Sequence, residues 1–226
     1  MVTCEVSDND GKVSRKKIKL EDFYGIILKS NNALSRPEWT YYFNPPGMFT
    51  GPGQTRGLVI GAGNGSSMRA LFFIPAGRQV LNYVGHIYIV PFPSLLFYFE
   101  SENGRLSVTR VFATRIRDCS ELGTDTQLYA FPFGNVDSYG GSVCWGETKH
   151  PPVQEISDFQ GIISSFFGSE INDDYYMAGK HVIQKEEFCM QRGLLIHLAA
   201  LDGGFPGEYL VKSQTTVKQI EEKFHF

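Results

Sequence analysis

The sequence predicts an α+β protein built around one main domain, and three observations support this fold class. Short β-rich runs alternate with turn residues from Met68 onward, a helical apolar pattern follows Pro152, and 226 residues suit a single domain. A chain of this length buries roughly 70% of its unfolded surface when it folds. We therefore expect folding to need neither a metal ion nor a disulfide.

Residues 1–56 are predicted to form an N-terminal extension, and residues 57–226 the main domain. In the extension, residues 7–17 are polar and predict an exposed lead-in, while KIKLEDFYGIILKS predicts an early strand pair. The run NPPGMFTGPGQTR, from Asn44 to Arg56, is too rich in Pro and Gly for regular structure. It predicts a long loop before the main domain.

The first half of the main domain predicts an antiparallel β-meander. Its β-rich runs, separated by turn residues, are MRALFFI, QVLNYV, HIYIV and LLFYFE. The strongest signal is Asn103-Gly104, because both residues tolerate the positive φ angles of a tight turn between LLFYFE and RLSVTRVFA. We expect a hairpin there.

Two helices are predicted after the meander. The first runs from near Pro152 to near Gly168, since apolar residues recur there at steps of three and four: Val153, Ile156, Phe159, Ile162, Ile163, Phe166 and Phe167. Proline suits the first turn of a helix, and glycine suits the position just past its end. The second helix is predicted over TTVKQIEEKF at the C-terminus.

Composition argues against several classes of partner. A net charge of -3 lacks the excess of Lys and Arg that nucleic acids attract. The sequence has no uninterrupted run of about 18 apolar residues, so no membrane span is predicted. The first residues, MVTCEVSDNDGKVSRKK, lack the apolar core of a secretory signal. We therefore expect a cytoplasmic protein without nucleic-acid or membrane partners.

The four cysteines, Cys4, Cys119, Cys144 and Cys189, are expected to be free, because cytoplasmic thiols stay reduced. They form no CxxC pair, so no zinc site is predicted. The five histidines are scattered without the i, i+4 pairing of a helical metal site. Among them, His150 follows Cys144 by six residues and could reach it.

The glycine-rich run GLVIGAGNGSSMRAL superficially matches a dinucleotide-binding fingerprint. Ser66 occupies its third position, and Pro75 follows too soon for the helix that would hold a pyrophosphate. No Asp or Glu lies between Glu38 and Glu100 to accept the ribose hydroxyls. A P-loop is also absent, so no nucleotide or other cofactor is expected.

Cys144 lies in the turn-rich run NVDSYGGSVCWGETKHPP, and its role has several alternatives. Most free cysteines are small buried apolar residues. The caspase pentapeptide has Gln and Ala where this chain has Ser142 and Val143, and a papain-type cysteine needs more chain after it. A catalytic triad is thus not predicted. The glycines around Cys144 describe a loop that can approach another backbone closely, which suits a reactive thiol.

The run FPFGNVDSYGGSVCWG resembles the active-site segment of ubiquitin-conjugating enzymes, in which an Asn precedes a turn, a Gly and the catalytic Cys. The ordered set VPFPSLLFYF, LYAFPFGNV and GGSVCWG resembles the prokaryotic ubiquitin-conjugating family D. That family includes protein B of the PRTRC cassette of bacterial mobile elements. The resemblance is best over Val90–Pro152 and extends from about Gly57 to Gly207.

The resemblance implies an α+β, ubiquitin-conjugating-enzyme-like fold in which a cysteine loop and helices follow the meander. It implies a transferase that accepts a ubiquitin-like protein as a thioester on Cys144 and passes it to an amine. Asn135 would stabilise the oxyanion of aminolysis, and its alternative is a turn residue that bonds its own backbone. His150 and Asp137 are candidates for auxiliary roles.

The partners that the resemblance implies are a ThiF-like activating enzyme, a ubiquitin-like protein and a metal-dependent isopeptidase from the same operon. Two departures from the family pattern bear on Asn135. Phe133-Gly134 stand where the broader family has His-Pro, and the interval from Asn135 to Cys144 is one residue longer than in most eukaryotic members. The alternative function is a catalytically silent interaction or assembly module of the same fold.

Overall fold

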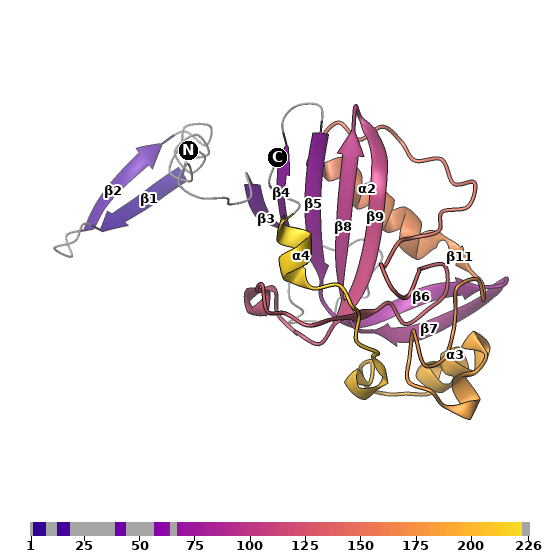
Figure 1. Ribbon diagram of the computed structural model, residues 1–226. Coiled ribbons are helices and arrows are strands. Elements are labelled where there is room, and N and C mark those ends of the chain that lie inside the picture. The colour runs from indigo at the N-terminus through magenta and orange to yellow at the C-terminus, as the bar shows by residue number, and fades with distance from the viewer. Residues whose placement is uncertain (1, 8–12, 19–38, 44–56, 64–66, 223–226) are drawn as a thin grey trace.

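The structure is a computed structural model that describes residues 2–7, 13–18, 39–43, 57–63 and 67–222 (Figure 1). The predicted Pro/Gly-rich loop lies outside these residues, as does most of the predicted early strand pair. Strand β1 (Val2–Ser7) pairs antiparallel with β2 (Val13–Ile18). The exposed lead-in predicted over residues 7–17 is therefore partly strand, because pairing with β1 satisfies backbone groups that the polar sequence alone leaves to water.

A six-stranded antiparallel sheet forms the centre of the fold, in the order β10-β9-β8-β5-β4-β3. Its strands are β3 (Trp39–Phe43), β4 (Gly57–Gly63), β5 (Ser67–Ile74), β8 (Ser94–Glu102), β9 (Arg105–Thr114) and β10 (Leu128–Ala130). The sheet thus includes a strand from the segment that we assign to the N-terminal extension. The division at residue 57 stays a prediction.

The predicted hairpin is present, with Asn103 and Gly104 at φ angles of 50° and 72° between β8 and β9. The single meander is wrong, because β6 (Gly77–Tyr83) and β7 (His86–Phe92) leave the main sheet. They form a second sheet with the parallel two-residue strand β11 (Glu170–Ile171), and β5 pairs directly with β8. Figure 1 shows β6 and β7 crossing beneath the main sheet.

Burial explains why β6 and β7 separate from the central strands. Strand β8 is buried at nearly every position, so both of its faces need an apolar cover, whereas β6 carries exposed and half-buried side chains between its buried ones. Pro75 and Pro93 stand at the two ends of the β6–β7 hairpin. Proline lacks the N–H that a central strand would donate, so the ladder ends at these points.

The two faces of the main sheet carry separate cores. On one face, Phe72 and Phe99 pack against Phe159 of helix α2 (Ile156–Gly168), with ring centroids 6.1 and 5.0 Å away. On the other face, Leu71 and Tyr98 belong to a cluster that contains Val217 and Ile220 of α4 (Val217–Glu221). Figure 1 shows α2 and α4 on opposite sides of the sheet. The near-continuous apolar run of β8 follows from this double cover.

Helix α2 ends at Gly168 as predicted but begins at Ile156, after Pro152. The Asp158 carboxylate accepts from the backbone N–H groups of Gln154 and Glu155, at 2.7 and 3.0 Å, and so fixes this start. The C-terminal helix is confirmed as α4, capped by Thr216. Helix α3 (Gln191–Ala199) was not predicted, although its Leu residues have helical spacing.

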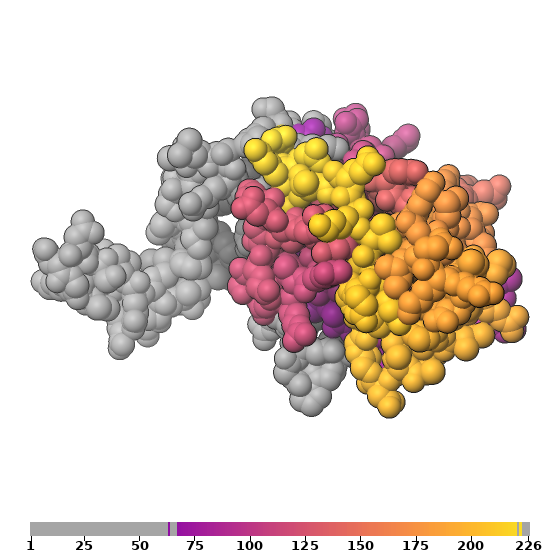
Figure 2. Space-filling view, turned by 60° about the horizontal axis from the view of Figure 1, so that its bottom comes forward, coloured from indigo at the N-terminus to yellow at the C-terminus, as the bar shows by residue number. Residues whose placement is uncertain are grey.

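Within the described residues, the other helical turns are 3₁₀ segments over Cys119–Glu121, Glu186–Phe188 and Gly207–Tyr209. The last two belong to the C-terminal third, which shares one face of the molecule in Figure 2. There the rings of Phe188 and Tyr209, one from each segment, pack with centroids 5.2 Å apart. In the run GLVIGAGNGSSMRAL, strand β4 and the first residues of β5 pair antiparallel, and the absence of a nucleotide site stays a prediction.

Candidate functional site

Residues 135–144 form a short hairpin that places its two ends side by side. Val136 and Val143 form a β-bridge, and Asp137 N donates to Ser142 O at 2.9 Å. At the open end, Cys144 N donates to Asn135 O at 2.8 Å. Asn135 and Cys144, nine positions apart in sequence, are therefore direct neighbours.

This hairpin, which we call the Cys144 loop, is held on the edge of β9. Val111 N donates to Gly141 O at 2.8 Å, and Val143 N donates to Thr109 O at 3.1 Å. Gly141 has a φ of 69°, and an added Cβ would lie 2.8 Å from both the Phe112 ring and Val111 O. Glycine is thus required where the loop meets the strand.

Asn135 is fixed by contacts with the segment that follows α2. Its backbone has a φ of 62°, and its N–H donates to Asp174 O at 2.9 Å. Its side-chain Nδ2 donates to Glu170 O at 2.9 Å, and its Oδ1 accepts from Asn172 N at 3.3 Å. Because the amide nitrogen carries two hydrogens, one further donor remains on Nδ2.

Cys144 is exposed and lines a cavity of about 380 Å³. The loop shares this cavity with Phe166 of α2 and with residues 169–172 and 174. Asn135 and Trp145 line the same cavity, together with Val143, Gly146, Thr148, Phe166, Ser169, Glu170, Ile171, Asn172 and Asp174. Both residues that the sequence singles out for chemistry therefore face one space.

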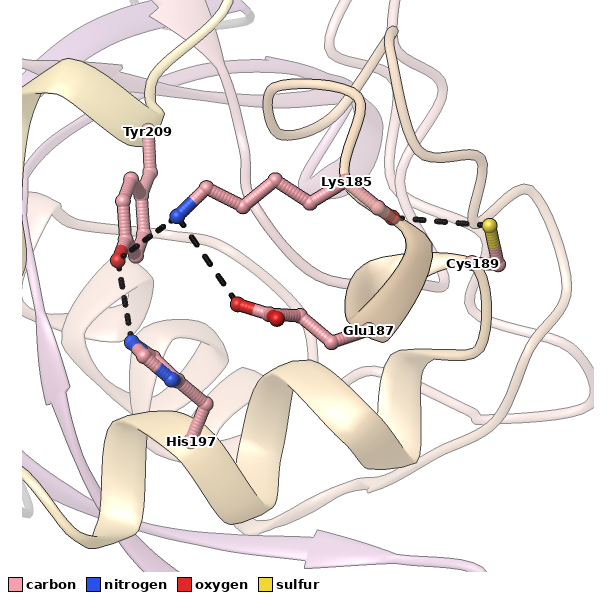
Figure 3. A network of polar contacts seen from close by, with 5 residues as sticks. All are labelled: Lys185, Glu187, Cys189, His197 and Tyr209. Carbon is pink, nitrogen blue, oxygen red and sulfur yellow. Dashed lines mark hydrogen bonds and ion pairs between the residues drawn. The ribbon is translucent and has the colours of Figure 1, made fainter.

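The other described cysteine side chains lie elsewhere. Cys119 is buried in the core that contains α4. Cys189 is exposed at the end of the Glu186–Phe188 turn, where its thiol donates to Lys185 O at 3.6 Å (Figure 3). Its sulfur also accepts from Gln184 Nε2 at 3.8 Å. Of these three cysteines, Cys144 is the one that lines the cavity.

His150 lies against Trp145 and outside this cavity. The two rings make an edge contact with centroids 4.3 Å apart, and His150 lines a separate hollow with Arg105 and Lys149. Both ring nitrogens of His150 are buried without a hydrogen-bond partner among the described residues. Burial lowers the pKa of His150 below its usual 6.5. Its auxiliary role stays a prediction, and Trp145 separates it from the thiol's cavity.

Asp137 shapes the tip of the Cys144 loop. Its Oδ2 accepts from Gly140 N at 2.6 Å, and its backbone oxygen accepts from Gly141 N at 2.9 Å. These contacts are those of a turn residue whose carboxylate bonds the backbone ahead of it. Asp137 is not among the residues that line the cavity.

The sequence analysis missed the acidic segment opposite Cys144. Glu170 Oε2 accepts from Gly85 N at 2.9 Å, and Asp174 Oδ2 accepts from Asn172 Nδ2 at 3.0 Å. Between them, Asp173 accepts from the Tyr83 hydroxyl at 2.8 Å. The compact polar run SEINDD after the helix was the available signal. The contacts with Tyr83 and Gly85 tie the segment to the β6–β7 hairpin, and its contacts with Asn135 tie it to the Cys144 loop.

No metal or membrane feature accompanies the site in the part of the chain that the structure describes. There, no group of three or more His, Cys, Asp or Glu side chains is placed to hold a metal ion. No helix among the described residues combines the length and the apolar character that spanning a bilayer requires.

Comparison with known proteins identifies a family for this chain. The family model of prokaryotic E2 family D matches residues 65–212, which contain the whole of β5 and every residue that lines the cavity. No curated protein matches the chain, and no solved structure does. The α+β architecture, with antiparallel sheets and few helices, is consistent with an E2-like fold. The chain therefore belongs to prokaryotic E2 family D, a ubiquitin-conjugating-like family.

Proposed function

We propose that this protein carries a ubiquitin-like protein as a thioester on Cys144 and transfers it to an amine. One observation supports this most directly: in a chain of an E2 family, an exposed thiol and an amide side chain share one cavity. The proposal makes the protein a transferase that works by acyl transfer. It needs no cofactor, because the carboxylate reaches it already activated.

The first step is transthiolation. The Cys144 thiolate attacks the carbonyl carbon of the thioester that the activating enzyme holds, a new S–C bond forms, and the activating enzyme's thiolate leaves. An ordinary cysteine is a few per cent thiolate at neutral pH, which supplies the nucleophile without a dedicated base. The exposed position of Cys144 leaves its sulfur open to a large partner.

The second step is aminolysis. The amine nitrogen attacks the thioester carbon, a C–N bond forms, the C–S bond breaks with Cys144 leaving as thiolate, and the amine releases its proton to solvent. The oxyanion that forms during attack accepts a hydrogen bond from the second N–H of Asn135 Nδ2. Glu170 and Asp174 line the same cavity, and their carboxylates attract a protonated amine, which releases one proton to solvent before its nitrogen attacks and a second one afterwards.

The partners that fit this chemistry are a ThiF-like activating enzyme, a ubiquitin-like protein and a metal-dependent isopeptidase encoded in the same operon. A PRTRC-type cassette on a bacterial mobile element would supply them. We assign the contact with the activating enzyme to the β6–β7 hairpin, whose exposed apolar side chains are Val80, Val84, Ile87 and Ile89. Val84 N donates to Ile171 O at 3.2 Å, so this surface adjoins the cavity wall.

The test is reconstitution with the activating enzyme and ubiquitin-like protein encoded beside this gene. With ATP and magnesium, wild type should form a conjugate that disappears under reductant. Cys144→Ser should form one that resists thiol reductant, because its link is an oxyester, and Cys144→Ala should form none. Cys189→Ala is the matched control, because Cys189 is also exposed.

A silent assembly module of the same fold is the second candidate function. The observation that favours it is that both polar atoms of the Asn135 side chain already have backbone partners. If the activating enzyme visibly charges itself while wild-type protein forms no conjugate, the assembly module replaces the carrier as the proposed function.

A further inference from the structure

Two polar side chains from the C-terminal half are fully buried behind the Cys144 loop. His181 is 1% exposed and Gln191 is 0% exposed. They contact the backbone immediately after and immediately before Asn135, from 45 and 57 positions away in sequence. Neither side chain lines the cavity, so neither can touch a substrate there.

Gln191 holds the backbone before Asn135. Its Oε1 accepts from Gly134 N, and its Nε2 donates to Asn172 O at 3.0 Å. An added Cβ on Gly134 would collide with that same Asn172 oxygen. One buried amide therefore joins the backbone before Asn135 to the segment that follows α2.

His181 holds the backbone after Asn135. Its Nε2 lies 2.9 Å from Val136 O, and its Nδ1 lies 3.1 Å from Met177 N. Because Met177 N–H needs an acceptor and Val136 O needs a donor, the neutral tautomer with its proton on Nε2 satisfies both. The imidazole also stacks on the Tyr176 ring, with centroids 5.8 Å apart.

Fixing both neighbours fixes Asn135 itself. Asn135 has a φ of 62°, in the left-handed region that asparagine adopts more readily than most residues, and hydrogen bonds on both sides hold it there. Asn135 O in turn accepts from Cys144 N, and Val136 forms the β-bridge with Val143. The two buried contacts thus set the position of Asn135 relative to the thiol.

We propose that His181 and Gln191 are positioning residues that hold Asn135 and Cys144 at the spacing required for amine transfer. This inference rests on the proposed carrier function. Burying polar side chains is costly unless they are hydrogen-bonded, and an apolar pair of similar size would fill the same volume without that cost. The polar pair instead supplies two directional contacts, one on each side of a single residue.

The experiment compares His181→Leu, which removes the contact to Val136 O, with His181→Gln, which keeps an N–H donor near the Nε2 position. Gln191→Met removes both amide contacts at similar length. We expect loading of Cys144 to change little, while transfer to amine slows about 100-fold in the Leu and Met variants, since a misplacement of about 1 Å typically costs that much. The Gln variant should recover most of the rate.

Tyr209→Phe is the control for a general loss of stability. The Tyr209 hydroxyl joins Lys185 Nζ at 3.3 Å and His197 Nε2 at 3.1 Å, in a polar network of the same C-terminal third (Figure 3). None of these residues lines the cavity. Tyr209→Phe should lower the unfolding temperature and leave the ratio of transfer to loading unchanged. Equal ratios in His181→Leu and wild type would overturn the inference.

Two readouts separate this inference from the carrier function. Hydrogen exchange of the Cys144 backbone N–H, which donates to Asn135 O, needs no partner protein and should become faster in His181→Leu. If wild type forms no thioester and this exchange still becomes faster, the carrier function fails and the positioning contact stands. If His181→Leu does not fold, nitrogen NMR of the wild-type imidazole decides: an Nε2 without a proton could not donate to Val136 O and would overturn the inference.

Discussion

Asn135 combines a positive φ angle with a side chain whose two polar atoms have backbone partners. Replacing it by alanine alters both features, because alanine lacks the amide and is strained at positive φ. Asn135→Gly removes the amide without that strain. We expect both variants to load normally and to transfer about 100- to 1,000-fold more slowly, the typical loss for one oxyanion donor.

Gel assays of loading and single-turnover transfer measure these two steps separately. Asn135→Ala should also unfold at a lower temperature than Asn135→Gly, since only alanine strains the backbone. Normal transfer by the glycine variant would make Asn135 a turn residue, which is the alternative that its backbone contacts already suggest.

His150 predicts a pH dependence of stability. Its pKa is lowered by burial, so near and below its usual value of 6.5 the unfolded chain binds the proton more readily than the folded one. The stability that comes from the neutral ring is therefore complete above that value and is lost as the pH falls. His150→Phe should reduce the drop in unfolding temperature between about pH 7.5 and about pH 5.5.

The matched control for that measurement is His86→Phe, because His86 is exposed at the start of β7. It should retain the wild-type slope of unfolding temperature against pH. If His150→Phe keeps the wild-type slope of unfolding temperature against pH, the prediction is wrong. The ring nitrogens of His150 would then have hydrogen-bond partners in solution.

At the scale of elements, the junction between the Cys144 loop and β9 depends on Gly141. A Cβ there would meet the Phe112 ring and Val111 O at 2.8 Å, whereas a Cβ on Gly146 would meet nothing within 4 Å. Both glycines have positive φ, so alanine costs about 1 kcal/mol of backbone strain at either position. Gly141→Ala should lose about 1–3 kcal/mol more, the usual cost of overpacking.

Urea denaturation of the two glycine variants measures this difference in the free energy of unfolding. Equal losses would mean that the loop moves away from β9 without cost. In that case β9 would not hold the loop in place.

The elements that the sequence predicts well are those with local signals. Asn103-Gly104 specifies its own turn, and the apolar spacing up to Gly168 specifies α2 within its own length. The departure of β6 and β7 from the main sheet is different, because it depends on whether both faces of β8 are covered by distant residues. Periodicity along one strand does not contain that information.

The candidate site also has a part that local sequence predicts and a part that it does not. Cys144 and Asn135 lie in one recognisable run, and their shared cavity follows from a ten-residue hairpin. Glu170, His181 and Gln191 reach the loop from segments 35 to 57 positions away. An isolated residue forms no periodic pattern or motif in the sequence. Its long-range contacts can therefore be identified only from the folded structure.

At the scale of the whole molecule, the β6–β7 hairpin presents a cluster of exposed apolar side chains. Ile87 is 65% exposed there, and Ile196 of α3 is 55% exposed on another element. Exposed apolar clusters of this kind mark sites of protein association. We expect Ile87→Glu to weaken charging by the activating enzyme and Ile196→Glu to leave it near wild type.

The readout is the initial rate of thioester formation at several concentrations of activating enzyme, with Cys144 alkylation as a check on the site. An increased half-saturation concentration with unchanged alkylation is expected for Ile87→Glu. The same defect in both variants would assign the contact to a broader surface than the hairpin.

Trp145 allows binding events in the cavity to be followed by tryptophan fluorescence. The chain has two tryptophans, Trp39 in β3 and Trp145, so Trp39→Phe leaves one indole beside the thiol. Indole emission depends on the polarity around the ring, and an acyl chain on Cys144 would displace water from the space that Trp145 lines. Stopped-flow fluorescence could then follow arrival and departure of the carried protein in real time, without a dye and without a gel.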